Sequence, residues 1–201
     1  MNMHPTDHQA SQRGFTLIEM VVAVALFAIV MVVSIGALLS LVDANRKARA
    51  LESVMNNLNI SLDSMVRAMR MGSKYNCGGT LIPDPSAGAD CATTGGTLFS
   101  FAPYGSDSTE QNERTVYFFQ ADSDGVGRLY RSQDGGGSSI AITAPEISID
   151  DVKIYAIGTQ PGDIVQPKAV VVIKGSAGAT NTKLRTTFYI QATAVQRSLD
   201  I

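Results

Sequence analysis

The hydrophobic and polar positions divide the chain into three regions of different periodicity. From Met20 to Val42 every residue is uncharged, and no proline interrupts the run. At roughly 1.5 Å per residue these residues form a helix of about 34 Å, which is enough to cross a hydrocarbon core of about 30 Å. We therefore expect a membrane-spanning helix over residues 15–42.

The pattern changes after Asp43. Apolar side chains then recur at spacings of three and four on a polar background, at Leu51, Met55, Leu58, Leu62, Met65 and Met69. One stripe at this spacing predicts an amphipathic helix over residues 43–71 whose apolar face must be covered by another layer. Gly72 follows the stripe and is typical of a helix C-terminus. The chain from Phe15 to Met71 would form one helix about 85 Å long.

Beyond the helix, residues 72–97 are rich in glycine and proline, which predicts an irregular loop. Period-two alternation over residues 98–201 then predicts a mostly antiparallel sheet of five to seven strands and an α+β fold. A break is expected at Asp150–Asp151, where two alternating registers meet. The predicted strands cover 98–101, 115–121, 126–132, 139–143, 147–157, 168–174 and 183–195.

The cysteines of the chain are Cys77 and Cys91, both in the predicted loop. A pair in an exported domain is first interpreted as a disulfide, which would staple a loop with little core of its own; free thiols are the alternative. Two cysteines alone do not supply the four ligands of a structural zinc site.

The sequence Asp122-Ser123-Asp124-Gly125 lies between two predicted strands and has two possible interpretations. Alternating aspartates followed by glycine begin calcium-binding loops, but Val126 and Arg128 occupy the next ligand positions. A hairpin turn is therefore the better prediction.

Composition excludes several classes of function. The formal net charge is −2, so no overall basic character indicates nucleic-acid binding. His4 and His8 are the histidines of the chain, and both lie in the polar segment before the apolar helix. Once residues 1–14 are removed, no histidine remains for Ser-His-Asp or Cys-His catalysis or for metal binding. We expect no enzyme activity, metal or cofactor.

Glu19 is the candidate functional residue of the apolar helix. A carboxylate within a membrane segment costs about 2.5–3.5 kcal/mol on insertion scales, so it indicates a function by default. The junction Gly14-Phe15 separates a polar leader from the apolar helix at its first residue. A secretory signal peptide would be cut after its apolar region instead. Cleavage after Gly14 would leave a free amine one turn before Glu19.

The sequence Arg13-Gly14-Phe15-Thr16-Leu17-Ile18-Glu19 and the apolar run after it resemble the N-terminus of type IV pilins and of type II secretion pseudopilins. The resemblance implies cleavage after Gly14 by a prepilin peptidase, N-methylation of Phe15, and an assembly role for Glu19. In that role the carboxylate meets the Phe15 amine of a neighbouring subunit. It also implies a long helix packed on a sheet, with a variable loop between them, here 72–97.

The resemblance implies a structural subunit, and the region from Leu62 through the cysteine loop looks more like a minor pilin or pseudopilin of the W or J type. The implied partners are membrane lipid, other pilin subunits, the peptidase, and an assembly platform with its ATPase. The implied location is the inner membrane, with the C-terminal domain outside, and then a filament. Pilus and secretion pseudopilus are not distinguished.

Two features leave alternatives open. Arg46, Lys47 and Arg49 outweigh the leader's Arg13, so charge alone would place residues 43 onward in the cytoplasm, although long domains translocate largely regardless of charge. Gly36 either weakens the helix, so that the segment unwinds in a filament, or permits close helix packing.

Three basic residues near the predicted helix end, Arg67, Arg70 and Lys74, are interpreted first as a solvated face and second as a surface for DNA or another subunit. The alternative functions are a tip adhesin or DNA-uptake module, with residues 72–96 as its likeliest surface, and a membrane-anchored enzyme.

Overall fold

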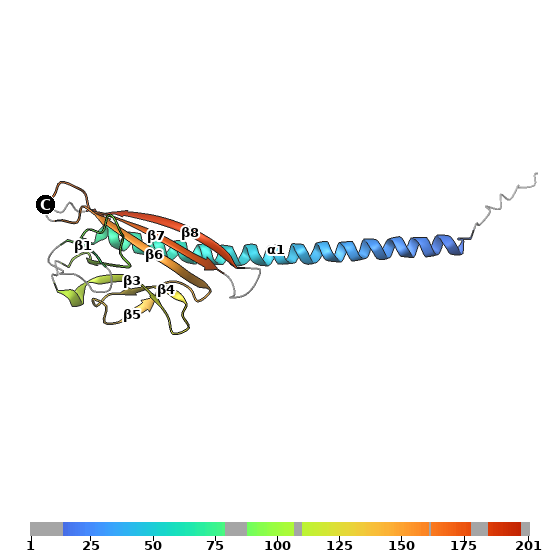
Figure 1. Ribbon diagram of the computed structural model, residues 1–201, viewed down its shortest axis with the longest axis horizontal. Helices are drawn as coiled ribbons and strands as arrows, with labels where there is room; N and C mark the ends of the chain where they lie inside the picture. The colour runs from blue at the N-terminus through green and yellow to red at the C-terminus, as the bar shows by residue number, and fades with distance from the viewer. Residues whose placement is uncertain (1–13, 79–87, 107–109, 161, 178–184, 198–201) are drawn as a thin grey trace, which may run out of the picture. The chain divides into compact units, whose positions relative to one another are not determined.

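The computed structural model describes residues 14–78, 88–106, 110–160, 162–177 and 185–197 (Figure 1). The chain divides into two compact units, Met1–Arg46 and Lys47–Ile201. The leader expected at residues 1–14 lies outside the described residues except for Gly14.

Helix α1 runs from Leu17 to Met71, which is 55 residues. It ends where the sequence predicts, because the Gly72 amide donates to the carbonyls of Ala68 and Met69, each at 3.0 Å. A Cβ at Gly72 would lie 2.2 Å from a ring carbon of Phe101, so a side chain at this position would clash with the buried Phe101 ring.

The buried face of α1 differs from the predicted apolar stripe at one position. Leu58, Leu62, Met65 and Met69 are buried as expected, but Val54 completes the buried face in place of Met55, which is 37% exposed. An α-helix advances 100° per residue, so Val54 and Met55 point in clearly different directions, and contact with the sheets selects Val54. Met55 was therefore a wrong prediction for the core.

The described residues contain eight strands in two antiparallel sheets, so the prediction of one sheet with five to seven strands is wrong in number and arrangement, whereas the α+β class is confirmed. The five-stranded sheet has the order β1-β2-β3-β4-β5, and the three-stranded sheet the order β6-β7-β8. The bounds are β1 Ser73–Gly78, β2 Leu98–Ala102, β3 Thr115–Ala121, β4 Gly127–Ser132, β5 Ser139–Ala141, β6 Ile147–Ile157, β7 Lys168–Ala177 and β8 Thr186–Val195; a 3-10 turn, η1, covers Gln111–Glu113.

Strand β1 lies in the segment expected to be irregular. It pairs with β2 with a register shift between Ser73 and Asn76, and Lys74 has a φ of 52°. Tyr75 is fully buried, and its hydroxyl donates to the Met69 carbonyl at 2.6 Å. Because Lys74 belongs to β1, it does not continue the helical face of Arg67 and Arg70 as predicted.

Two predictions within the three-stranded sheet are confirmed. The register of β6 against β7 shifts between Ile149 and Asp151, at the expected break. Strand β8 alternates as predicted, with Phe188 and Ala194 buried and Tyr189 exposed. This alternation turns one face of the sheet toward the core.

The core of the second unit combines α1 with both sheets. Two polar contacts fix the helix beside the segment between β5 and β6: Ser61 Oγ donates to the Ile142 carbonyl at 2.7 Å, and the Ala144 amide donates to Asn57 Oδ1 at 3.2 Å. The largest fully buried side chain is Arg114, whose guanidinium donates to the Lys74 carbonyl and to Ser100 Oγ. Burial lowers the pKa of Arg114 to about 10.

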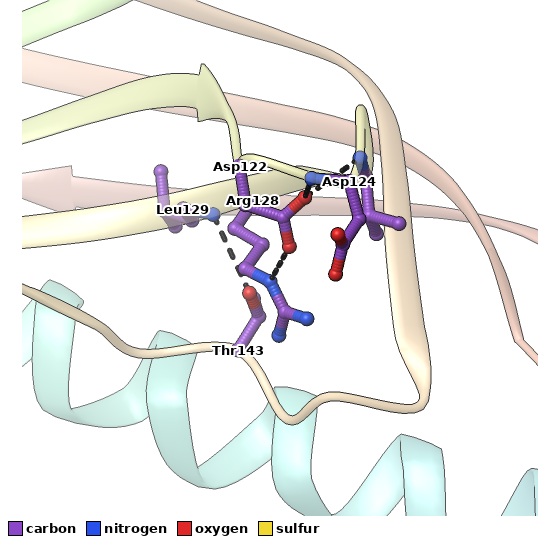
Figure 2. A network of polar contacts seen from close by, with 6 residues as sticks. Asp122, Asp124, Arg128, Leu129 and Thr143 are labelled. Carbon is purple, nitrogen blue, oxygen red and sulfur yellow. Dashed lines mark hydrogen bonds and ion pairs between the residues drawn. The ribbon is translucent and has the colours of Figure 1, made fainter.

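The segment Asp122–Gly125 is a turn, as predicted, and joins β3 to β4. Asp122 Oδ1 accepts hydrogen bonds from the amides of Asp124 at 2.9 Å and Val126 at 3.0 Å. Its Oδ2 accepts a hydrogen bond from Nε of Arg128 at 2.6 Å. Figure 2 draws this contact beside the two backbone contacts of the turn. All of these hydrogen-bond donors belong to the hairpin itself. They explain why an aspartate stands at this position without requiring a metal ion.

The Arg128 hydrogen bond, together with the backbone amides, lowers the pKa of Asp122 below its ordinary value of 3.8. A carboxyl group whose pKa is lower in the folded state stabilises that state above the unfolded pKa, and the contribution is lost as the pH falls through the folded value. We expect an Asp122→Asn variant to lose less stability than the native protein as the pH falls below about 4. Urea midpoints measured between pH 2 and 6 test this, with Asp124→Asn as the control; parallel native and Asp122→Asn profiles would contradict it.

Candidate assembly site

The start of α1 is organised by Thr16. The Glu19 amide donates to Thr16 Oγ1 at 3.3 Å, and the Met20 amide donates to the Thr16 carbonyl at 3.2 Å. A threonine in this position satisfies an otherwise unpaired donor of the first helical turn. Thr16 is therefore a capping residue that the sequence analysis did not single out, although a threonine three residues before a glutamate is a recognisable capping signal.

Glu19 lies in the first turn of α1, whereas Phe15 lies two residues before Leu17, so the helix begins later than the predicted start at Phe15. The Phe15 side chain is 77% exposed, and Glu19 is exposed as well. The partial positive charge of a helix N-terminus favours a carboxylate in its first turn. In the uncut chain the Phe15 nitrogen is part of a peptide bond, so it gains a charge only if the bond to Gly14 is cleaved.

In the part of the chain that the structure describes, no residue covers the apolar side chains of the first unit. Every large apolar side chain from Phe15 to Val42 is exposed. The helix is long and apolar enough here to cross a membrane, and none of its most apolar window is buried. Such a surface is stable only in lipid or against similar helices.

Gly36 lies within this uninterrupted helix, and a Cβ added there would meet no atom within 4 Å. Ser34 Oγ donates to the Val30 carbonyl at 2.7 Å, which satisfies its hydroxyl inside the helix. The small side chains thus leave a shallow place on the helix surface. Both interpretations of Gly36, as a weak point and as a packing position, remain predictions.

The cysteines belong to the second unit, whereas Gly14, Phe15 and Glu19 belong to the first. A disulfide joins Cys77, in β1, to Cys91, with 5.8 Å between the Cα atoms. Cys91 also pairs with β6: its amide donates to the Ala156 carbonyl at 3.1 Å, and the Ala156 amide donates to its Sγ at 3.3 Å. The disulfide therefore links an edge of the five-stranded sheet to an edge of the three-stranded sheet.

Asp90 holds the same region to the segment after β6. Its carboxylate accepts hydrogen bonds from the Gly158 amide at 3.2 Å, from the Thr159 amide at 2.9 Å and from Thr159 Oγ1 at 2.7 Å. Sequence analysis missed this contact because the partners lie 68 and 69 positions away and carry no local pattern.

The described part of the chain contains no group of three or more histidine, cysteine, aspartate or glutamate side chains that could hold a metal ion.

Comparison with known proteins gives a match at the N-terminus. A family model for the prokaryotic N-terminal methylation motif matches residues 9–35, which include Gly14, Phe15 and Glu19. No curated protein and no solved structure matches the chain. The motif, the apolar helix that follows it and the α+β fold together support a relationship of this chain to the type IV pilin and pseudopilin family.

Proposed function

We propose that this protein is a structural subunit of a type IV pilus-like filament, assembled through its N-terminal helix. The observation that carries the proposal is the position of Glu19. It lies in the first turn of an uncovered apolar helix, four residues after Phe15 and inside the matched methylation motif.

The proposed assembly step follows from electrostatics. Cleavage after Gly14 produces an amine on Phe15, and N-methylation retains its positive charge. A carboxylate and an ammonium group are each costly in lipid, and pairing them between neighbouring subunits offsets part of that cost. Since the pair forms in only one relative position of two helices, it also fixes the stagger between subunits.

The domain divisions follow from the same proposal. Residues 1–14 are the leader, 15–42 the membrane and assembly helix, 43–71 the helix that supports the sheets, 72–97 the disulfide-closed segment, and 98–201 the rest of the outer domain. Other pilin subunits and a prepilin peptidase are the first partners, with an assembly platform and its ATPase. The globular domain lies outside the inner membrane, and the subunit is a minor one of the W or J type.

A purely structural role agrees with the family that the motif supports, which is not known for enzymatic activity. In this role the chain is a substrate of the processing and assembly machinery and performs no reaction itself.

Mass spectrometry of the mature protein tests the processing step. Protein extracted from filaments is expected to begin with N-methylated Phe15, whereas a Gly14→Val chain is expected to retain its leader because the larger side chain obstructs cleavage. A Gly36→Val chain is the control for adding the same side chain to this helix and should be processed normally. An intact leader on native chains recovered from filaments would refute the proposal.

A further inference from the structure

Among the described residues, three of the four sheet edges are short or covered. The edge of β1 is covered by Ala89, which accepts from the Cys77 amide at 3.1 Å. The edge of β6 pairs with Gly96, through two hydrogen bonds of 2.8 Å to Ile154. Strand β5 is only three residues long. The fourth edge belongs to β8, which has ten residues and forms the rim of its sheet (Figure 1).

Two backbone contacts show which groups of β8 face outward. The Gln196 amide donates to the Pro167 carbonyl at 2.8 Å, toward the β7 side. Because hydrogen-bonded and non-hydrogen-bonded pairs alternate in an antiparallel ladder, the even-numbered residues of β8 bond to β7 and the odd-numbered ones direct their amides and carbonyls outward. The next odd-numbered residue, Arg197, follows this rule: its amide donates to the Arg70 carbonyl of α1 at 2.9 Å.

The outward groups before Arg197 have no partner in the described part of the chain. They belong to Thr187, Tyr189, Gln191, Thr193 and Val195, all of which also have exposed side chains. Natural sheets protect a long edge with charged residues, proline or a bulge. Strand β8 has no charged residue and no proline, and its ten-residue register against β7 is unbroken. It is therefore a ready template for another strand.

A hollow lies where such a strand would meet the end of β8. It has a volume of about 560 Å³ and is lined by Asp63, Val66, Arg67, Arg70, Met71 and Arg197. Three arginines and one aspartate line it, and none of the three arginines forms an ion pair with a described residue. The lining thus combines two apolar side chains, Val66 and Met71, with a net positive charge.

We infer that the edge of β8 binds an extended segment of another polypeptide by strand addition, and that this segment is uncharged along its length and carries carboxylates at the end that reaches the hollow. Main-chain hydrogen bonds supply the affinity of such an interaction, and the pockets beside the edge supply its specificity. A second copy of β8 is a poor occupant, because Arg185 and Arg197 flank the strand. In an antiparallel pair of two β8 strands, Arg185 of one copy would lie opposite Arg197 of the other, and the like charges would repel. The inference is independent of assembly through Glu19.

A pair of synthetic peptides tests this with the full-length chain in detergent micelles. Each peptide has eight alternating valine and threonine residues; one carries two aspartates at an end and the other two lysines, and both placements of the charged end are used. The aspartate peptides should bind more tightly in at least one placement. On binding, the amides of the odd-numbered residues of β8 should become protected from hydrogen exchange, while the even-numbered ones should change little.

Three variants separate strand addition from simple charge attraction. Gln191→Pro removes an outward amide that forms no hydrogen bond to β7, so this variant should abolish binding. Its unfolding is measured alongside to confirm that the sheet persists. Arg67→Glu should weaken binding of the aspartate peptide by at least about fivefold. Loss of one exposed ion pair weakens binding by up to about fivefold, and the glutamate adds repulsion of the peptide's carboxylates. Arg49→Glu, also exposed on α1 but outside the hollow, is the matched control and should leave binding unchanged.

Equal affinity for the aspartate and lysine peptides, or protection without the odd–even alternation, would overturn the inference. Binding of a duplex DNA oligonucleotide that depends on Arg67, with no peptide binding, would assign the arginines to nucleic acid instead. Peptide binding that appears only after residues 198–201 are deleted would assign the hollow to the chain's own end. Either result would also refute the inference.

Discussion

A Glu19→Ala chain is expected to insert into the membrane at least as well as the native chain but to be nearly absent from filaments. Insertion should not suffer because removing a carboxylate from the apolar segment saves about 2.5–3.5 kcal/mol on insertion scales. Assembly should fail because the Phe15 ammonium of a neighbouring subunit would then be in lipid without a counter-charge. Quantifying the protein in membrane and sheared-filament fractions measures both effects.

Two controls separate charge from size and from general effects on the helix. Glu19→Gln keeps the shape of the side chain and removes its charge, so it should assemble as poorly as Glu19→Ala. Glu52→Ala removes an exposed carboxylate from the polar part of the same helix and should assemble normally. Native levels of Glu19→Ala in filaments would remove the proposed role of this carboxylate.

Loss of the disulfide should have the largest effect on the stability of the globular domain. The cysteines are 14 positions apart, and closing a loop of this length stabilises a fold by about 3 kcal/mol in the chain-entropy model. In this fold the disulfide also joins two sheet edges, and Cys77 is only 5% exposed. The double variant Cys77→Ala/Cys91→Ala should therefore lose about 3 kcal/mol of unfolding free energy.

Denaturant unfolding of the native chain with and without a reducing agent, beside the double variant, measures this loss. The native chain should unfold at a lower denaturant concentration once reduced, and the double variant should be indifferent to the reducing agent. Identical midpoints for the oxidised and reduced native chain would show that the disulfide contributes nothing to stability.

The elements with strong periodicity could be predicted from the sequence. The apolar run and the stripe that follows it predict α1 and most of its buried face, because apolar residues spaced three and four apart lie on one side of a helix. Strands β3, β4, β6 and β8 are likewise marked by alternation, and β3 and β4 also by the turn signal at Asp122–Gly125 between them. The Gly14-Phe15 junction and Glu19 are recognisable for a similar reason, since their meaning depends on local offsets within one helix.

The pairing of those elements could not be predicted in the same way. Strand β1 has no clean alternation, and it becomes a strand because β2 is available beside it and because Tyr75 fits under the end of α1. The division of the strands into two sheets depends on contacts between residues far apart in the sequence. The choice of Val54 over Met55 for the core depends in the same way on where the sheets touch the helix.

The sequence by itself determined that an apolar helix with one carboxylate near its beginning precedes an amphipathic helix and a β-rich domain, because burial of apolar surface acts on local patterns. Only the tertiary structure decided which sheet edges are covered, that no described residue pairs with the outer edge of β8, and how the disulfide and Asp90 connect the two sheets. The sheet edges are decided by hydrogen bonds between distant backbone groups, which every residue except proline carries alike and which leave no trace in the pattern of side chains. The disulfide and the Asp90 contacts depend instead on which distant residues the fold brings beside these side chains.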